Sequence, residues 1–378
     1  GLAGPARYHG GIARNIAPES CMPTIQRCLP ALAALLLVAS TAHAQASKVP
    51  KTGAVWYGDL ASARAYMGDT AKLYELKHRG VKVEVKAIGT VAALDALAQG
   101  RVDLVGSARL ADPDNAFEQG LVFTPVVWDA IVLVTSAKNP VGGLTLEQIA
   151  DIYLGRITDW SQLGGPAKPI NLYAVAGPDD GVEFSLRRDL LGNGNRVVAA
   201  KRWYINTQQL EDAIAIDPAA LGVTTLSSQA RNKLLKPLAI EGTIPSFKTL
   251  ESGEYLFSLP LYLVARGPDA PQGDSSARAR DALEFMNGES ALRAAWRSRQ
   301  LVPAVEAGKL AEADARHRAL IAERLAFAVA AVPVNVVPTA QIASQAALVT
   351  PVQGAAAPVT ASALPEPAPA AQPAVPCK

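Results

Sequence analysis

The chain has 378 residues, of which 49% are hydrophobic and 19% charged, and its formal net charge is +2. Three basic residues but only one acidic residue lie before residue 45, so the rest of the chain is neutral. Nucleic-acid-binding proteins carry a basic excess, so this balance argues against that class. At about 150 residues per domain, the length predicts roughly two domains.

The three cysteines, Cys21, Cys28 and Cys377, all lie outside residues 45–325. A disulfide framework and a cysteine-ligated zinc site are therefore excluded from that central part. Only two of the four histidines, His78 and His317, belong to it, so a histidine-rich metal site is not expected. The sequence predicts no metal and no cofactor.

The N-terminal region has the pattern of a secretory signal peptide. After Met22 come a short segment with Arg27, the apolar run 28–39 and a small-x-small site ending at Ala44. This order predicts export with cleavage after Ala44, and residues 1–21 lie upstream of the expected start. The run is short for a membrane span, and a buried helix is the alternative. We expect a periplasmic protein.

The first elements of the central part predict a parallel sheet. Residues 81–85 (VKVEV) alternate apolar and polar side chains, which is typical of a strand. A helix follows over residues 91–100, with Leu94 and Leu97 on one face and Gly100 as its end. Residues 102–105 form the next strand, and this strand–helix–strand order favours parallel pairing.

The same alternation continues along the chain. Strands are predicted at residues 128–134, 169–175, 221–226 and 262–265. Helices are predicted at 144–153, 182–191, 277–286, 290–299 and 305–325, with Thr145 near the N-cap of the first. The fold class is therefore α/β.

The composition changes after residue 325. Residues 326–378 contain nine prolines but only two charged residues, Glu366 and Lys378. No periodicity extends across this stretch, which predicts a disordered Ala/Pro-rich tail. Its partner is unknown, and Cys377 would be an exposed thiol that could link two copies.

One motif resembles a known family. Residues 139–165 read NPVGGLTLEQIADIYLGRITDWSQLGG and resemble the phosphate-binding-protein family, the periplasmic solute receptors of phosphate ABC importers. Three further blocks resemble that family in the same order: residues 100–111 (GRVDLVGSARLA), residues 220–223 with 240–246, and residues 252–267 (SGEYLFSLPLYLVARG). The resemblance covers residues 53–303.

The resemblance implies a type II periplasmic-binding-protein fold, with two α/β lobes and a ligand cleft between them. We place lobe I at residues 50–130 plus 260–325 and lobe II at residues 131–259. The resemblance implies that the protein binds phosphate or a related small oxyanion by hinge closure. The closed protein would then dock on an ABC permease in the inner membrane.

The resemblance also implies four loops around the ligand, which correspond in chain order to residues 57–62, 89–91, 107–109 and 174–182. Buried oxyanions are held by helix N-termini, hydroxyls and backbone N–H groups, with an arginine for charge. Two alternatives stay open: Thr90 as a plain helix cap, and Arg109 as a surface arginine in a salt bridge. Carried over onto this chain, the predicted ligand-binding residues are Gly58, Asp59, Thr90, Ser107, Arg109, Asp180 and Gly181.

Two of these loops depart from the family pattern. Asp59 occupies or borders a donor position in the first loop, and the fourth lacks the family's arginine and Ser-Gly-Thr. Asp179 and Asp180 stand there instead, and Pro178 removes a backbone donor. Carboxylates facing a bound phosphate would repel it by several kcal/mol. The alternative is that Asp179 and Asp180 cap the next helix with their side chains in solvent.

The sequence also bears on functions other than that of a receptor. The central part holds no G-x-S-x-G, H-E-x-x-H, P-loop or G-x-G-x-x-G motif, so an enzyme is not expected. The remaining alternative is a non-transport binding, scaffold or sensor protein on the same fold with a different or lost ligand.

Overall fold

The structure is a computed structural model and describes residues 54–175, 179–267 and 274–330. All of these belong to one unit, Val49–Lys378. The predicted signal peptide (residues 22–44), the three cysteines and the predicted tail beyond residue 330 lie outside the described residues. No helix in the described part is both long and apolar enough to cross a membrane.

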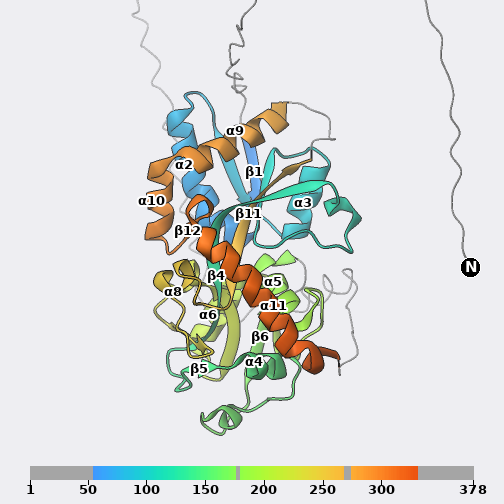
Figure 1. The fold of residues 1–378 in the computed structure, drawn as a ribbon, viewed down its shortest axis with the longest axis vertical. Helices are drawn as coiled ribbons and strands as arrows, with labels where there is room; N and C mark the ends of the chain where they lie inside the picture. The colour runs from blue at the N-terminus through green and yellow to red at the C-terminus, as the bar shows by residue number, and fades with distance from the viewer. Residues whose placement is uncertain (1–53, 176–178, 268–273, 331–378) are drawn as a thin grey trace, which may run out of the picture. The chain divides into compact units, whose positions relative to one another are not determined.

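A mixed sheet of ten strands forms the centre (Figure 1), and its main path runs β2-β1-β3-β11-β4-β8-β6-β7. The strands on this path are β1 (Ala54–Gly58), β2 (Val83–Ala87), β3 (Leu104–Ser107), β4 (Leu121–Ser136), β6 (Asn171–Val175), β7 (Arg202–Tyr204), β8 (Ala220–Thr225) and β11 (Ser258–Arg266). Off the path, β9 (Leu235–Pro237) and β12 (Val302–Pro303) pair with β4. A separate two-stranded sheet joins β5 (Gly143–Leu144) and β10 (Ala239–Ile240).

Strand β4 belongs to both ends of this sheet. Its residues 121–130 pair antiparallel with β11, and its residues 131–135 pair antiparallel with β8. The partner therefore changes between Ala130 and Ile131. We call β2, β1, β3, β11 and residues 121–130 the first half-sheet, and residues 131–136 with β8, β6 and β7 the second half-sheet. The numbered limits of the two lobes stay a prediction.

The parallel pairs expected from the sequence are present. Strand β1 pairs in parallel with β2 and β3, and β6 pairs in parallel with β7 and β8. Such pairs need crossover connections, and helices supply them. They are α1 (Leu60–Ser62), the π-helix η1 (Ala63–Met67), α2 (Gly68–Lys77), α3 (Thr90–Ala98), α5 (Gly181–Leu191) and α6 (Thr207–Ile216). Helix α4 (Leu146–Tyr153) precedes β6, and α7 (Leu226–Gln229) follows β8.

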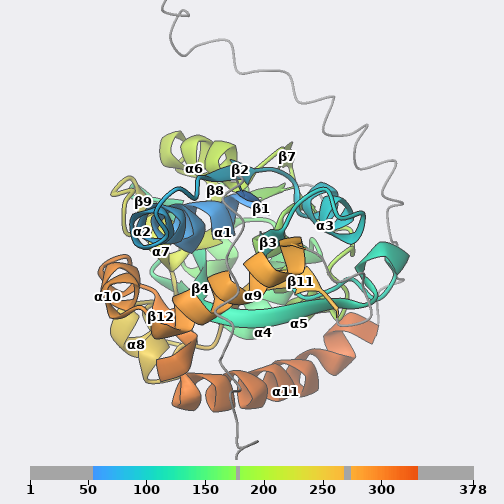
Figure 2. The ribbon, with the colours of Figure 1, turned by 90° about the horizontal axis from the view of Figure 1, so that it is seen from above.

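The remaining helical segments are α8 (Phe247–Glu251), α9 (Asp274–Gly288), α10 (Ser290–Ser298), α11 (Gly308–Ala330) and the 3-10 turns η2 (Ala116–Glu118), η3 (Trp160–Leu163) and η5 (Ala304–Glu306). Helices cover the sheet on several sides (Figure 2). The predicted apolar face of α3 is confirmed, because Leu94 and Leu97 are fully buried against Val105 and Val264.

Every strand and helix predicted between residues 81 and 325 overlaps an observed element. The N-cap role of Thr145 is confirmed, since its side chain accepts a hydrogen bond from Gln148 N and completes a capping box. The predictions missed the segment from β1 to α2, the helices α6 and α8, and the short strands β7, β9, β10 and β12. Helix α2 lacks a strong apolar face because several of its charged residues alternate with buried ones.

Helix α11 continues into the predicted tail, since residues 326–330 are helical. These residues are alanine-rich and precede the first proline of the tail, Pro333, so the helix has no reason to end at residue 325. The helix packs against α5, α4 and α8 and lies across the front of the sheet in Figure 1. Arg318 joins it to Asp189 of α5 at 2.6 Å and also binds Asp314 within α11 at 2.8 Å.

We expect Arg318→Met to lower the free energy of unfolding by about 2 kcal/mol, because it leaves two largely buried carboxylates without their shared cation. Urea unfolding followed by circular dichroism measures the change. Arg316→Met, at an exposed position of the same helix, is the control. An equal effect of the two substitutions would contradict this role of Arg318.

Candidate functional site

The seven predicted site residues lie at strand ends and helix starts of the central sheet. Gly58 and Ser107 end β1 and β3, and Thr90 and Gly181 begin α3 and α5. The other three, Asp59, Arg109 and Asp180, lie one or two residues from these ends. In open α/β sheets, ligands bind at such strand ends, so these residues lie where a ligand site is expected.

Asp59 ties the first loop to the third. It is the N-cap of α1, and its Oδ1 accepts a hydrogen bond from Ser62 N at 2.8 Å. Its Oδ2 accepts from Ala108 N at 2.6 Å. The side chain is buried, and burial raises the pKa of the Asp59 carboxyl to about 6 against the opposing effect of these two donors. Both oxygens of this carboxylate are therefore used within the chain.

Asp180 forms the corresponding cap in the fourth loop. Its Oδ1 accepts from Val182 N at 3.1 Å and Glu183 N at 3.0 Å, at the start of α5. Its Oδ2 accepts from the Thr207 hydroxyl at 2.5 Å, at the start of α6. The expectation of a helix cap is correct, but Asp180 is only 7% exposed, so its side chain does not lie in solvent.

Asp179 connects the fourth loop to the second. Its Oδ1 accepts from Val91 N at 3.3 Å, in the first turn of α3. The Thr90 hydroxyl donates to the backbone carbonyl of Asp179 at 3.0 Å. Gly89, rather than Thr90, is the N-cap of α3, so the reading of Thr90 as a plain cap is wrong. Asp179 itself does not cap α5.

Two glycines of the predicted site have different packing roles. A Cβ on Gly181 would lie 2.7 Å from Asp59 Oδ2 and 3.0 Å from the Ala108 carbonyl carbon. A Cβ on Gly58 would lie 2.5 Å from Met67 Sδ, so this glycine makes room for the core. Gly181 thus brings the first, third and fourth loops together, whereas Gly58 serves packing beneath them.

The third loop is built around a buried ion pair. Ser107 Oγ donates to the Arg109 carbonyl at 2.8 Å, which fixes the turn. The Arg109 guanidinium forms a bidentate pair with Glu118 of η2, with both N–O distances 2.7 Å, and lies over the Phe184 ring at 4.8 Å. The alternative of a salt-bridged arginine is therefore correct, although the pair is fully buried rather than at the surface.

Three aspartates consequently occupy backbone donors of all four loops. Helix N-termini leave N–H groups without intrahelical partners, and here carboxylate oxygens satisfy those of Ser62, Val91, Val182 and Glu183. Such groups are suited to oxyanions, and a carboxylate is one. A phosphate placed here would compete with these side chains and be repelled by their charge.

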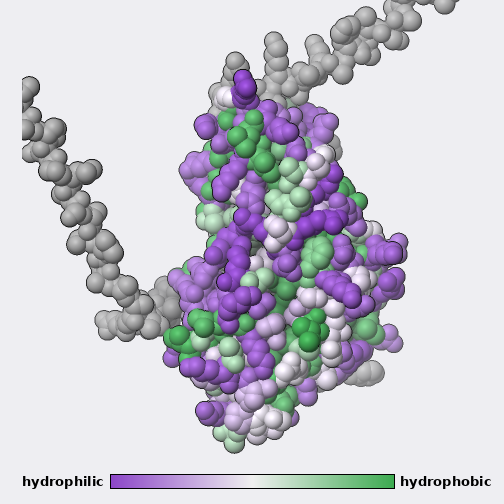
Figure 3. All heavy atoms as spheres, turned by 90° about the vertical axis from the view of Figure 1, so that its left-hand side faces the viewer, coloured by the Kyte–Doolittle hydropathy of each residue, from purple (hydrophilic) through white to green (hydrophobic). Residues whose placement is uncertain are grey.

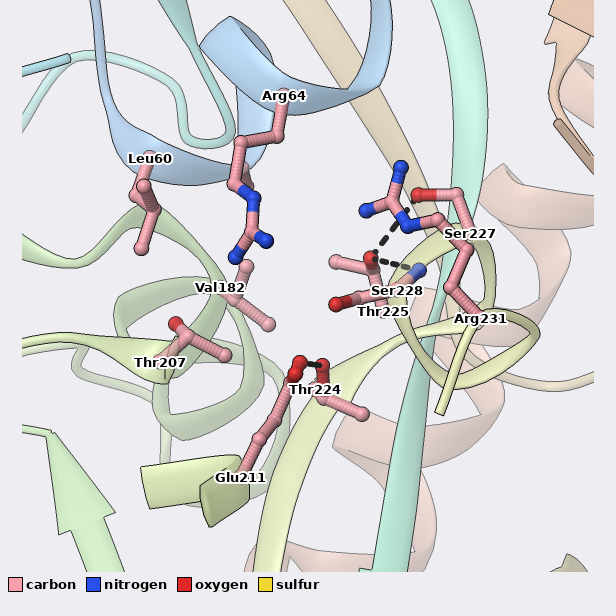
Figure 4. Close-up of a pocket in the computed structure, with 11 residues that line it drawn as sticks. Leu60, Arg64, Val182, Thr207, Glu211, Thr224, Thr225, Ser227, Ser228 and Arg231 are labelled. Atoms are coloured by element: carbon pink, nitrogen blue, oxygen red, sulfur yellow. Dashed lines mark hydrogen bonds between the residues drawn. The ribbon is translucent and has the colours of Figure 1, made fainter. Parts of the chain in front are cut away.

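Beside the four loops lies a pocket with residues that the sequence analysis missed (Figure 4). Thr207, the partner of Asp180, is one of its lining residues, together with Arg64 of η1 and Arg231 just after α7. Arg64 lies five residues after Asp59 of the first loop, and this closeness in sequence is the signal by which it could have been found. No group of three His, Cys, Asp or Glu side chains in the described ranges is placed to hold a metal ion.

We expect Glu118→Gln to lower the free energy of unfolding by about 3–5 kcal/mol, because it leaves the buried Arg109 charge without its counter-charge. Thermal and urea unfolding both measure the loss. Asp95→Asn removes the partner of the exposed Arg101 and should cost less than about 1 kcal/mol. If Glu118→Gln cost no more than this control, the ion pair would not be what holds the third loop.

The sequence is similar to known phosphate-binding proteins. The chain is 25% identical over 211 residues to the phosphate-binding protein PstS of Bacillus subtilis, covering 55% of this chain and 66% of that protein. It is 25% identical over 206 residues to PstS of Borreliella burgdorferi, covering 50% and 71%. The chain thus spans about two thirds of the length of these relatives.

Solved structures share the fold. A putative phosphate ABC transporter substrate-binding protein with bound phosphate from Clostridium perfringens superposes with a TM-score of 0.58 at 20% identity, covering 67% of this chain and 99% of that one. An ABC-type phosphate transport receptor from Vibrio cholerae gives 0.52 at 23% identity, covering 64% and 98%. The predicted fold, two α/β lobes with a ligand cleft between them, is confirmed.

The family itself follows from a match along the chain. A family model described as a PBP superfamily domain matches residues 61–287, which is more than half of the sequence. That range contains three of the four loops and every strand of both half-sheets except β1. The chain therefore belongs to the PBP superfamily.

Proposed function

We propose that this protein is an exported solute-binding protein that binds phosphate or a related small oxyanion at the four loops and closes its two half-sheets over it. It would act in the periplasm and deliver its ligand to an ABC permease in the inner membrane. It is proposed as a receptor and not as an enzyme. Relatives named phosphate-binding proteins support this proposal.

The observation that carries the proposal is that backbone N–H groups of the four loops donate hydrogen bonds to carboxylate oxygens. The Ser62 N–H donates to a carboxylate of its own loop. The N–H groups of Val91 and Ala108 donate to carboxylates of other loops. The N–H groups of Val182 and Glu183 donate to the carboxylate of Asp180. Donors that already hold carboxylates have the direction and local potential that an oxyanion needs.

Closure would act at the point where the strands change partners. In β4 the partner changes between Ala130 and Ile131, and Ile131 N donates to the Phe257 carbonyl at 2.9 Å, just before β11. The two connecting segments therefore run side by side. A hinge of this kind needs a change in only a few backbone angles.

A second candidate function is favoured by the three aspartates. If Asp59, Asp179 and Asp180 keep the loop donors, the loops would hold no external anion. The protein would then be a non-transport binding, scaffold or sensor protein whose ligand lies elsewhere. One titration distinguishes the two candidates.

Calorimetric titration of the full chain tests the proposal, after unfolding and refolding to strip any bound ligand. We expect phosphate to bind more tightly at pH 5.5 than at pH 7.5. The raised pKa of Asp59, about 6, means that acidification neutralises this carboxylate and removes a repelling charge from the site. Sulfate keeps its charge across this range, so its titration isolates the contribution of the protein.

A folded sample that gives no heat with phosphate at either pH would rule out the proposed function and leave the second candidate. Circular dichroism before each titration establishes that the sample is folded.

We expect Asp179→Asn to strengthen phosphate binding about tenfold at pH 7.5, because it removes one negative charge that faces the loop donors. The same calorimetry measures the change. Asp114→Asn, an exposed position outside the four loops, should leave the affinity unchanged. Weaker phosphate binding by Asp179→Asn would show that the carboxylate contacts the ligand as a hydrogen-bond acceptor.

A further inference from the structure

Strand β2 leaves one edge of the central sheet without a partner. It is the last strand at its end of the sheet, and within the described ranges it pairs only with β1. In Figure 2 the strands β11, β3, β1 and β2 follow one another outward to this edge. An unpaired edge is a template for a strand of another chain.

Hydrogen bonds between β1 and β2 show which backbone groups of β2 face outward. Ala54 N donates to the Lys82 carbonyl at 2.8 Å, and Ile88 N donates to the Gly58 carbonyl at 2.9 Å. In a parallel pair, alternate residues of a strand bond to the same neighbour, so the even-numbered residues of β2 bond to β1. The odd-numbered residues therefore point their N–H and C=O groups away from the sheet: Val83, Val85 and Ala87.

Helix α2 covers only the start of this edge. Glu75 Oε1 accepts a hydrogen bond from Val83 N at 2.7 Å, which confirms that this N–H points away from β1. Glu75 Oε2 also pairs with Lys82 Nζ at 3.4 Å. The N–H and C=O groups of Val85 and Ala87 take no such bond in the part of the chain that the structure describes. They are available to a second strand.

The same helix presents an apolar side chain beside the edge. Leu76, which follows Glu75 in α2, is 76% exposed. The face that carries α2 and α10 shows apolar side chains among hydrophilic ones in its upper part (Figure 3). A strand added to β2 would therefore bring a second chain close to exposed apolar surface, which favours a protein partner.

The charged side chains of β2 are complementary to those of a second β2. Glu84 and Lys86 are exposed on one face of the strand, with Oε1 and Nζ 3.4 Å apart. In an antiparallel pair with Val85 opposite Val85, Glu84 of each copy lies opposite Lys86 of the other. These are the positions at which cross-strand side chains come closest. A parallel pair in the same register would instead oppose like charges.

The same register also uses the outward backbone groups. Val85 of each copy would exchange N–H and C=O hydrogen bonds with Val85 of the other, and Ala87 N of each copy would donate to the Val83 carbonyl of the other. None of these bonds needs the Val83 N–H, which Glu75 holds. Backbone and side chains thus favour one arrangement, and it has two-fold symmetry.

We propose that β2 is a dimerisation edge on which a second copy of this chain pairs its own β2 antiparallel, about a two-fold axis at Val85. The first half-sheets of the two copies would then form one continuous sheet. None of the residues of this contact belongs to the four loops or lines the pocket beside them. The inference is therefore independent of the proposed binding of phosphate.

Sedimentation velocity of the full chain tests the dimer, with a reducing agent present so that Cys377 cannot link two copies. A five-residue strand pair is a small contact, so we expect dimers at about 100 μM and monomers at about 1 μM. Glu84→Lys and Lys86→Glu should each raise the dissociation constant at least about tenfold, because each replaces two opposite-charge pairs by like charges.

An equimolar mixture of these two variants is the decisive sample. We expect it to dimerise although neither variant does so alone, because the lysines of one then lie opposite the glutamates of the other. Glu312→Lys makes the same charge change at an exposed position of α11 and is the matched control, which should dimerise like the wild type.

Val85→Pro tests the backbone bonds. It removes an N–H that β1 does not use, and proline is tolerated at sheet edges, so the variant should keep its circular dichroism spectrum and lose the dimer. A wild-type chain that is monomeric at about 100 μM, or a dimer that Glu84→Lys leaves unchanged, would overturn the inference. A mixture of the two charge variants that stays monomeric would do so as well.

Discussion

Satisfying the backbone N–H groups at the strand-end loops is the constraint on which this site depends. Asp59, Asp179 and Asp180 place their oxygens on donors that helix geometry leaves free. The same hydrogen bonds join loops that are far apart in sequence, so one set of contacts both caps helices and connects the two half-sheets. An external oxyanion at these donors would have to replace bonds that already stabilise the fold.

The charges around the loops fall into two groups. Arg109 is neutralised by Glu118 in a dry environment, and removing either charge would leave the other buried and unpaired. Arg231, by contrast, has no partner among the described residues and lies at a pocket wall. A charge that the fold leaves without an ion-pair partner is available to a ligand, whereas the charge of Arg109 is already neutralised within the fold.

Strand β4 and helix α11 connect the parts that any closure would move. Residues from Val126 to Ser136 are buried throughout, although their pairing partner changes from β11 to β8. Helix α11 is fixed to α5 through Arg318 and Asp189, and to α4 through Arg324 and Glu147. Asp314 of the same helix accepts a hydrogen bond from Ser258, the first residue of β11, so α11 contacts elements of both half-sheets.

The sequence by itself determined the α/β class and the longer elements from residue 81 onward, because hydrophobic periodicity and caps are local, and the four loops followed from the resemblance to the phosphate-binding-protein family. It also identified the carboxylates at Asp59, Asp179 and Asp180 as a departure from the family pattern. Only the tertiary structure decided which donors those carboxylates take, that Glu118 pairs with Arg109, and that Arg64 and Arg231 line one pocket. These facts depend on contacts between residues distant in sequence, such as Asp59 with Ala108 and Asp180 with Thr207, and no local pattern encodes them.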